Sequence, residues 1–225
     1  MLRPMSGKSV PSVARGQQVQ GIVEVLRAEI IAGHLPPDAQ LRQEALAARF
    51  GVSRMPVREA LRELENQGFV IIPANHSARV APLLVEEMIE IFEMRALAEA
   101  LAVEKAIPNM TERDIDRAEA VALELEQAPV SEFARLNTAF HLALYRPCGR
   151  PRLLAHIESL GRAADRYLRA AAAGLDYRGP SDREHRAMVD ACRARDTMRA
   201  VELVRRHILD GCDVMERAMG KPSGD

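Results

Sequence analysis

The segment from residue 43 to residue 82 restricts the fold of this chain more than any other stretch. An apolar helical pattern leads to the tight-turn pair Gly51-Val52, and a second helical pattern follows. Ser53 is a suitable N-cap for that second helix, and Pro56 falls in its first turn, where a missing amide hydrogen costs nothing. The inward-facing residues of this helix recur at i, i+3, i+4 and i+7; they are Val57, Ala60, Leu61 and Leu64. This layout predicts a helix-turn-helix.

A row of arginines occupies another face of the second helix. Arg54, Arg58 and Arg62 are spaced at i, i+4 and i+8. Arginines at the start of a helix that follows a short turn suit the major groove of DNA, where guanidinium groups bond guanine edges or phosphates. Considered alone, the row is equally consistent with an ordinary solvated face, because three glutamates are interleaved with it: Glu59, Glu63 and Glu65.

The stretch after Gly68 predicts a two-stranded wing. Residues 69–72 form one strand-like run, residues 78–80 form the return strand, and the polar turn between them contains Asn75, His76 and Ser77. A wing that carries His76 and Arg79 beside an arginine-lined helix is difficult to explain by packing alone. We therefore expect a winged helix-turn-helix that binds double-stranded DNA.

The same residues resemble the GntR family of bacterial transcription regulators. The resemblance runs from about Val19 to Pro82, and the stretches FGVSRMPVREALRELENQGFV and GHLPPDAQLRQEALA carry it. It implies that the recognition helix and the wing tip contact operator DNA, the wing tip at the minor groove. The predicted contact residues are Ser53, Arg54, Met55, Pro56, Arg58, Asn75, His76, Ser77 and Arg79.

Two of these residues depart from the family pattern. Threonine is common where this chain has Met55, so an apolar contact, for example to a thymine methyl group, would replace a polar one. Glycine is usual where Ser77 stands, so the turn at the wing tip would differ in detail.

Length and charge indicate two domains. The chain has 225 residues, and ten of its 31 Lys and Arg but only seven of its 32 Asp and Glu lie in residues 1–80. A basic DNA-binding domain joined to an acidic second domain is thus expected. We expect residues 1–17 to be a disordered tail, residues 18–82 the DNA-binding domain and residues 83–220 a helical domain. Three cysteines without CxxC spacing predict reduced thiols. We expect a cytoplasmic protein, because neither a membrane span nor a signal sequence is recognisable.

The second half of the chain has helical signals and little that indicates strands. Pro108-Asn109, Thr111-x-x-Asp114, Gly179-Pro180 and the capping box Ser181-x-x-Glu184 mark its helix ends. We predict a mainly α protein in which an all-helical antiparallel bundle of six or seven helices follows the winged helix-turn-helix. The expected helices span residues 85–107, 111–126, 131–145, 150–173, 181–194 and 196–219, after a first helix at about 18–32.

Three histidines interrupt apolar stripes on three helices of the predicted bundle. They are His141, His185 and His207, and Asn137 lies one turn before the first of them. Neutral imidazoles that converge could hold a divalent metal, with the amide of Asn137 as an oxygen ligand. For any single histidine, however, a core imidazole bonded to a backbone carbonyl is the commoner explanation.

This half resembles the FCD domain, the helical effector domain of the FadR subfamily. The matching stretches are EIFEMRALAEALAVEKA, LNTAFHLALY, EHRAMVDACRARD and RRHI. In many members an aspartate and three histidines hold a metal, and the matching positions here are Asn137, His141, His185 and His207. Asn replaces the more usual Asp, which implies weaker binding or another ion. The ligand types favour zinc and permit nickel, manganese or iron.

Arg95 continues an inward-facing stripe, and a buried guanidinium needs an anion. Glu99, one turn further along the same face, is the simplest partner. The functional alternative is the carboxylate of a small effector, which arginine binds through two hydrogen bonds. The resemblance favours the effector, because ligands of such domains are commonly small organic acids beside the metal.

Together these patterns predict a homodimeric DNA-binding transcription regulator whose operator affinity is controlled by a small carboxylate at a metal site. One alternative is a helical domain that only dimerises, with a structural metal or none. Another is a metal-dependent enzyme. The sequence argues against an enzyme, because it has no general base at a recognisable spacing from the ligands.

Overall fold

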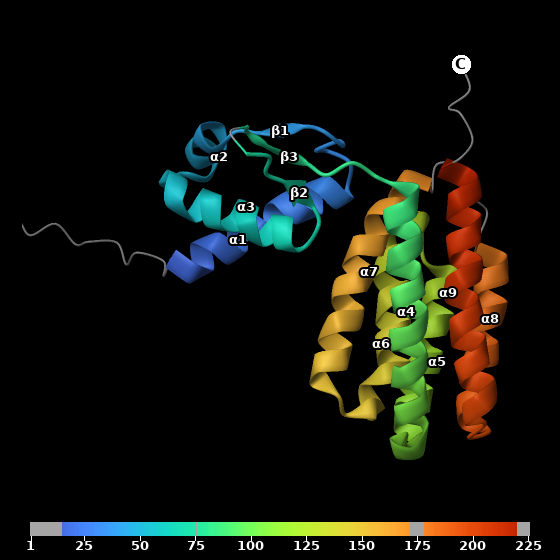
Figure 1. Ribbon diagram of the computed structural model, residues 1–225. Helices are drawn as coiled ribbons and strands as arrows, with labels where there is room; N and C mark the ends of the chain where they lie inside the picture. Colours follow the sequence, from blue (N-terminus) through green and yellow to red (C-terminus); the bar gives the residue numbers. More distant parts are fainter. Residues whose placement is uncertain (1–14, 75, 172–177, 220–225) are drawn as a thin grey trace, which may run out of the picture. The chain divides into compact units, whose positions relative to one another are not determined.

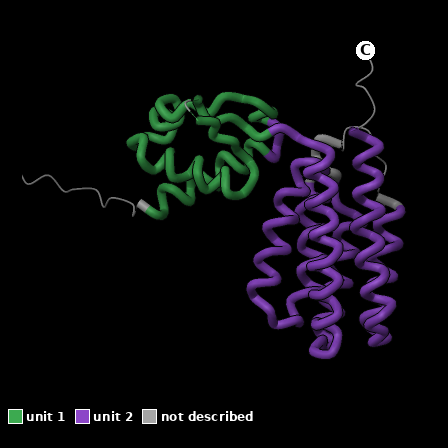
Figure 2. The backbone as a smooth tube through the Cα atoms, viewed as in Figure 1, with its two compact units in different colours: residues 1–30, 34–81 green, residues 31–33, 82–225 purple. Residues whose placement is uncertain are grey.

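The computed structural model describes residues 15–74, 76–171 and 178–219, which form two compact units (Figure 2). The first unit comprises the described residues up to 30 together with 34–81, and the second comprises residues 31–33 and those from 82 onward. The wing-tip residue Asn75 lies outside the described residues, as does the predicted tail up to residue 14. Residues 15–17, which we expected in the tail, are helical, because the first helix begins at Arg15.

The first unit is the predicted winged helix-turn-helix. Its sheet has the order β1-β3-β2 with antiparallel pairing, and Arg79 of the central strand pairs with Gln40 on one side and Ile71 on the other. The strand at Gln40–Leu41 was not predicted. The elements are α1 (Arg15–Ile31), β1 (Gln40–Leu41), α2 (Gln43–Phe50), α3 (Arg54–Asn66), β2 (Val70–Ile71) and β3 (Ala78–Val80) (Figure 1).

The turn between α2 and α3 fixes the direction in which α3 leaves it. Gly51 has a φ of 64°, in the left-handed region that glycine adopts without strain, and it ends α2. Ser53 stands at the N-cap position of α3, but its hydroxyl makes no capping hydrogen bond. The inward face of α3 packs as predicted: Val57, Ala60, Leu61 and Leu64 are all fully buried.

The second unit is an all-helical antiparallel bundle, as predicted (Figure 1). Its most extensive contacts join α4 to α9 and to α7, α5 to α6 and to α8, and α8 to α9. Within the described residues, no helix of the chain combines the length and apolar character needed to cross a membrane. In the part of this unit that the structure describes, the helices are α4 (Val85–Ala106), α5 (Glu112–Gln127), α6 (Val130–Tyr145), α7 (Pro151–Ala171), α8 (Arg178–Arg193) and α9 (Thr197–Met219), with short 3₁₀ turns at Ile107–Asn109 and Arg146–Cys148.

One helix start was predicted correctly and another was not. Thr111 and Asp114 form a capping box at the start of α5: the Thr111 hydroxyl accepts from the Asp114 amide, and the Asp114 carboxylate accepts from Thr111. The box expected at Ser181 and Glu184 is wrong, because α8 already begins at Arg178. Both side chains therefore lie inside a helix, where they bond to histidines.

Candidate metal centre and DNA-binding surface

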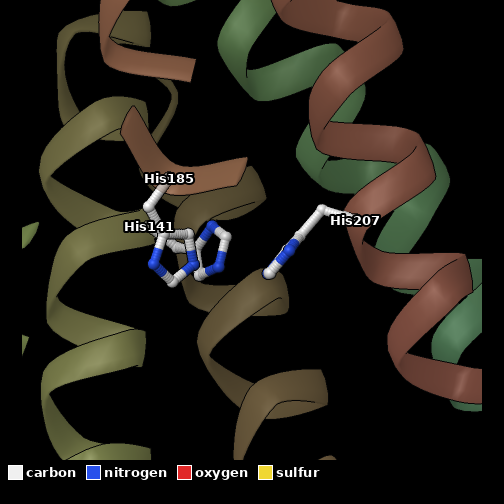
Figure 3. A group of neighbouring side chains, drawn as sticks. All are labelled: His141, His185 and His207. Carbon is white, nitrogen blue, oxygen red and sulfur yellow. The ribbon is translucent and has the colours of Figure 1, made fainter. Parts of the chain in front are cut away.

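Three imidazoles meet in the second unit, each from a different helix. His141 lies on α6, His185 on α8 and His207 on α9, and all three side chains are buried. Their candidate ligand atoms all lie within 4.8 Å of one another. Figure 3 shows the three rings turned toward a common centre. We refer to these residues as the histidine triad.

Two buried polar atoms beside this centre have no hydrogen-bond partner. They are Nε2 of His141 and Oδ1 of Asn137, which lies one helical turn earlier on α6. A buried polar atom without a partner is costly, so such atoms usually have a ligand, an ion or water. These two atoms are a nitrogen and an oxygen of the kinds that a divalent cation takes from proteins as ligands.

The charge state of two triad histidines also suits a metal. Burial lowers the pKa of His141 and of His185 well below the usual range, and the neighbouring His207 lowers both further. Both rings are therefore neutral near pH 7, which is the form that binds a metal ion.

Hydrogen bonds fix the orientation of two triad rings. Nδ1 of His207 lies 2.6 Å from Oε2 of Glu184 on α8. Nε2 of His185 lies 3.4 Å from the hydroxyl of Ser181, one turn earlier on the same helix. Partners that hold the outer nitrogen of a ligating histidine set which nitrogen faces the metal.

His141 is connected to the buried arginine that the sequence singled out. Its Nδ1 lies 3.0 Å from the hydroxyl of Tyr145, and that hydroxyl donates to Oε2 of Glu99 at 2.8 Å. The other oxygen of Glu99 accepts from Nε of Arg95 at 2.9 Å. The pairing between Arg95 and Glu99 that the sequence offered as the simplest explanation is therefore present.

The arginines of the predicted DNA-binding surface lie on the exposed side of α3. Arg54 forms an exposed ion pair with Glu44 of α2 at 2.6 Å, and a terminal nitrogen of Arg58 contacts the sulfur of Met55 at 2.7 Å. Met55 is 41% exposed, so an apolar group is presented beside the arginines. Pro56, in contrast, is buried and is not presented to solvent.

The wing presents its predicted residues to solvent as far as it is described. His76 and Ser77 are exposed, and Arg79 on β3 pairs with Asp38 at 3.1 Å. Asp38 has a φ of 64°, a left-handed conformation that aspartate tolerates better than most residues.

Four residues around the triad were missed from the sequence or given another role, and one of them is Ser181, expected as a cap but bonded to His185. Glu184 was interpreted as a capping residue, whereas it bonds His207. Tyr145 lies four residues after His141 on α6, so that spacing could have revealed it. Glu99 was recognised as a partner of Arg95 but not of Tyr145, because that contact joins two helices.

Comparison with known proteins gives two matches to family descriptions. Residues 18–80 match "Bacterial regulatory proteins, gntR family", and residues 90–210 match "FCD domain". The chain is 32% identical over 206 residues to the HTH-type transcriptional repressor GlaR of Escherichia coli, covering 86% of this chain and 94% of that protein.

Solved structures agree with the fold. A GntR family member from Pseudomonas syringae is 31% identical, with a TM-score of 0.55 over 92% of this chain and 88% of the other. McbR/YncC of E. coli has a TM-score of 0.77 over 90% of this chain and 99% of the other. At 22% identity, the second likeness supports the fold alone.

Proposed function

The chain belongs to the GntR family of bacterial regulatory proteins and is a DNA-binding transcriptional regulator, and from this premise we propose that a divalent metal and a small carboxylate control its operator affinity. The observation that carries the proposal is the histidine triad, whose ligand atoms lie within 4.8 Å of one another. Three imidazoles from three helices therefore converge on one buried centre.

The proposed metal ligands are His141, His185 and His207, with Asn137 as the oxygen donor. The partnerless Nε2 of His141 and Oδ1 of Asn137 support this set, since bonds to a cation would satisfy both. Three imidazoles and one amide oxygen suit zinc best, and nickel, manganese and iron take the same donor types. A bound divalent ion supplies positive charge and an open coordination position for a carboxylate.

Arg95 is the proposed anchor for the effector. It is 9% exposed, and its positive charge reaches His141, whose pKa it helps to lower. Glu99 accepts from Nε of the guanidinium, and this leaves the terminal nitrogens as the edge that a carboxylate would bind. The effector would then bridge Arg95 and the metal centre.

Control of DNA binding requires that the effector prefer one arrangement of the bundle. A ligand that bound two arrangements equally would shift nothing. The triad joins α6, α8 and α9, so closing it on a ligand would change how these helices pack. We propose that this change alters the relative placement of two recognition helices in a homodimer.

The proposed dimer is supported by an apolar stripe on α4. Met94, Leu97 and Leu101 recur at i, i+3 and i+7 and are 43%, 64% and 37% exposed. A second copy of this chain is the expected occupant, because helix-turn-helix proteins of this kind read symmetric half-sites as dimers. A dimer would also carry two DNA-binding domains and so twice the weak positive charge of a single domain.

A thermal-shift screen of small organic acids tests the function. The protein is screened metal-loaded and chelator-stripped, with His207→Ala as the site variant and His156→Ala, an exposed histidine of α7, as the matched control. An acid at 100 times its Kd adds about 2.7 kcal/mol, which raises the midpoint by several degrees. We expect this rise only in metal-loaded wild type and metal-loaded His156→Ala. Chelator-stripped protein and His207→Ala should not show it.

Other outcomes favour the alternatives. If no acid stabilises the protein and chelator changes nothing, a purely dimerising helical unit is the better explanation. If a bound acid is converted to a product, the site is that of a metal-dependent enzyme. Chromatography of each stabilising acid after incubation with the protein separates binding from turnover.

A further inference from the structure

Tyr145 lies between a carboxylate of α4 and the triad residue His141. Its hydroxyl oxygen is 2.8 Å from Oε2 of Glu99 and 3.0 Å from Nδ1 of His141, and the side chain is fully buried. A phenol has one hydrogen, so it can donate to only one of these neighbours. The choice determines where the proton of His141 resides.

Arg95 decides the direction of this hydrogen-bond chain. Its Nε donates to Oε1 of Glu99 at 2.9 Å, and the oxygens of a carboxylate paired with a guanidinium only accept hydrogen bonds. The phenolic hydrogen therefore goes to Glu99, since two acceptors facing each other would repel. The oxygen of Tyr145 must then accept from Nδ1–H of His141.

The consequence is a defined tautomer. A neutral imidazole that carries its proton on Nδ1 has its lone pair on Nε2. Nε2 of His141 is the buried ring nitrogen without a hydrogen-bond partner. We propose that Glu99 and Tyr145 are positioning residues that fix the tautomer of His141 and so direct the Nε2 lone pair to the centre of the histidine triad.

The tautomer is a property of the metal-free chain, whereas its effect on metal affinity rests on the proposed function. A histidine whose outer nitrogen is held by such partners binds metal more tightly, and loss of the partner typically lowers the affinity about 10- to 100-fold. Measuring the tautomer and the affinity separately tells the two ideas apart.

Glu99→Gln is the decisive variant because it keeps the shape and reverses the polarity. The amide oxygen of the new side chain can accept from Nε of Arg95, and its NH₂ then faces Tyr145 as a donor. Tyr145 would accept from that amide and donate to Nδ1 of His141. The proton of His141 would move to Nε2, and this nitrogen would then have no free lone pair to bind a metal.

The tautomer is read by ¹⁵N NMR of histidine-labelled, metal-free protein at a pH where the imidazoles are neutral. The wild type should show Nδ1–H at His141, and Glu99→Gln should show Nε2–H. Glu87→Gln is the matched control: Glu87, on the same helix, accepts from the buried Tyr167 at 2.9 Å without a triad histidine beside it. That variant should keep the wild-type tautomer.

Tyr145→Phe is the second variant, for the case in which Glu99→Gln does not fold. It keeps the ion pair of Arg95 and Glu99. It should give a mixture of tautomers at His141 and a metal affinity about 10- to 100-fold lower, whereas Tyr167→Phe should change neither. Nε2–H in the wild type, or an unchanged tautomer in folded Glu99→Gln and Tyr145→Phe, would overturn the proposal. If the tautomer responds as expected but the wild type binds no metal, the positioning role stands and the proposed function fails.

Discussion

Oε2 of Glu184 lies 2.6 Å from Nδ1 of His207, so a carboxylate on α8 holds an imidazole on α9. Because Nδ1 is engaged, Nε2 is the nitrogen that this histidine offers to a metal. A partner of this kind orients the ring and increases its basicity.

Replacing the carboxylate should therefore weaken the metal site without removing a ligand. We expect Glu184→Ala to bind zinc about 10- to 100-fold more weakly than the wild type, measured by competition with a chelating dye. Glu202→Ala is the control, since Glu202 is an exposed acid of α9 that pairs with Arg199 and Arg206. Equal affinities in the two variants would contradict the role of Glu184.

The recognition helix supplies a second prediction. Arg58→Ala should weaken binding to a DNA fragment selected in vitro with the wild type by about 5- to 150-fold, the equivalent of 1–3 kcal/mol for a lost contact to a base. Arg113→Ala, an exposed arginine of α5, makes the same change of charge away from α3. An Arg58→Ala titration that superimposes on that of Arg113→Ala would refute a contact by Arg58.

The apolar stripe of α4 predicts where two copies meet. Leu97→Glu places a charge at the most exposed residue of the stripe, so the dissociation constant of the dimer should rise by at least about tenfold in sedimentation equilibrium. Leu123→Glu is matched in chemistry, because Leu123 is 50% exposed on α5. If both variants dissociate equally, or neither does, the interface lies elsewhere.

Acid should destabilise the metal-free protein through the triad. Burial, and next His207, lower the pKa of His185 in the folded state, so the unfolded chain binds more protons once the pH falls below about 6.5. Stability is consequently lost as the pH falls. When the pH is lowered from about 7.5 to 5.5, the free energy of unfolding in urea should fall by about 1.4 kcal/mol less in His185→Gln than in the wild type. Identical losses would mean that His185 titrates alike in both states.

Local pattern was sufficient for most of the fold. Proline and glycine punctuation placed the helix ends within a few residues, for example α6 at Val130–Tyr145 against an expected start at Ser131. Contacts between residues i and i+4 of one helix could also be predicted from the sequence, as the pair of Arg95 and Glu99 shows. Both depend on neighbours along one helix, whose geometry the sequence determines.

Contacts between helices could not be predicted in the same way. The bonds from Glu184 to His207 and from Tyr145 to Glu99 depend on how each helix is rotated in the bundle. Apolar stripes specify that rotation only approximately. The strand at Gln40–Leu41 was missed for a related reason, since two residues carry no periodicity and pair only because β3 lies beside them.

Metal titration of chelator-stripped protein is the most direct test of whether the histidine triad binds a metal ion. Zinc is added to the wild type, His207→Ala and His156→Ala, excess ion is removed by gel filtration, and the bound metal is measured by elemental analysis. We expect about one ion per chain in the wild type and in His156→Ala, and little in His207→Ala. Equal occupancy in all three proteins, or none in the wild type, would contradict a metal site at the histidine triad.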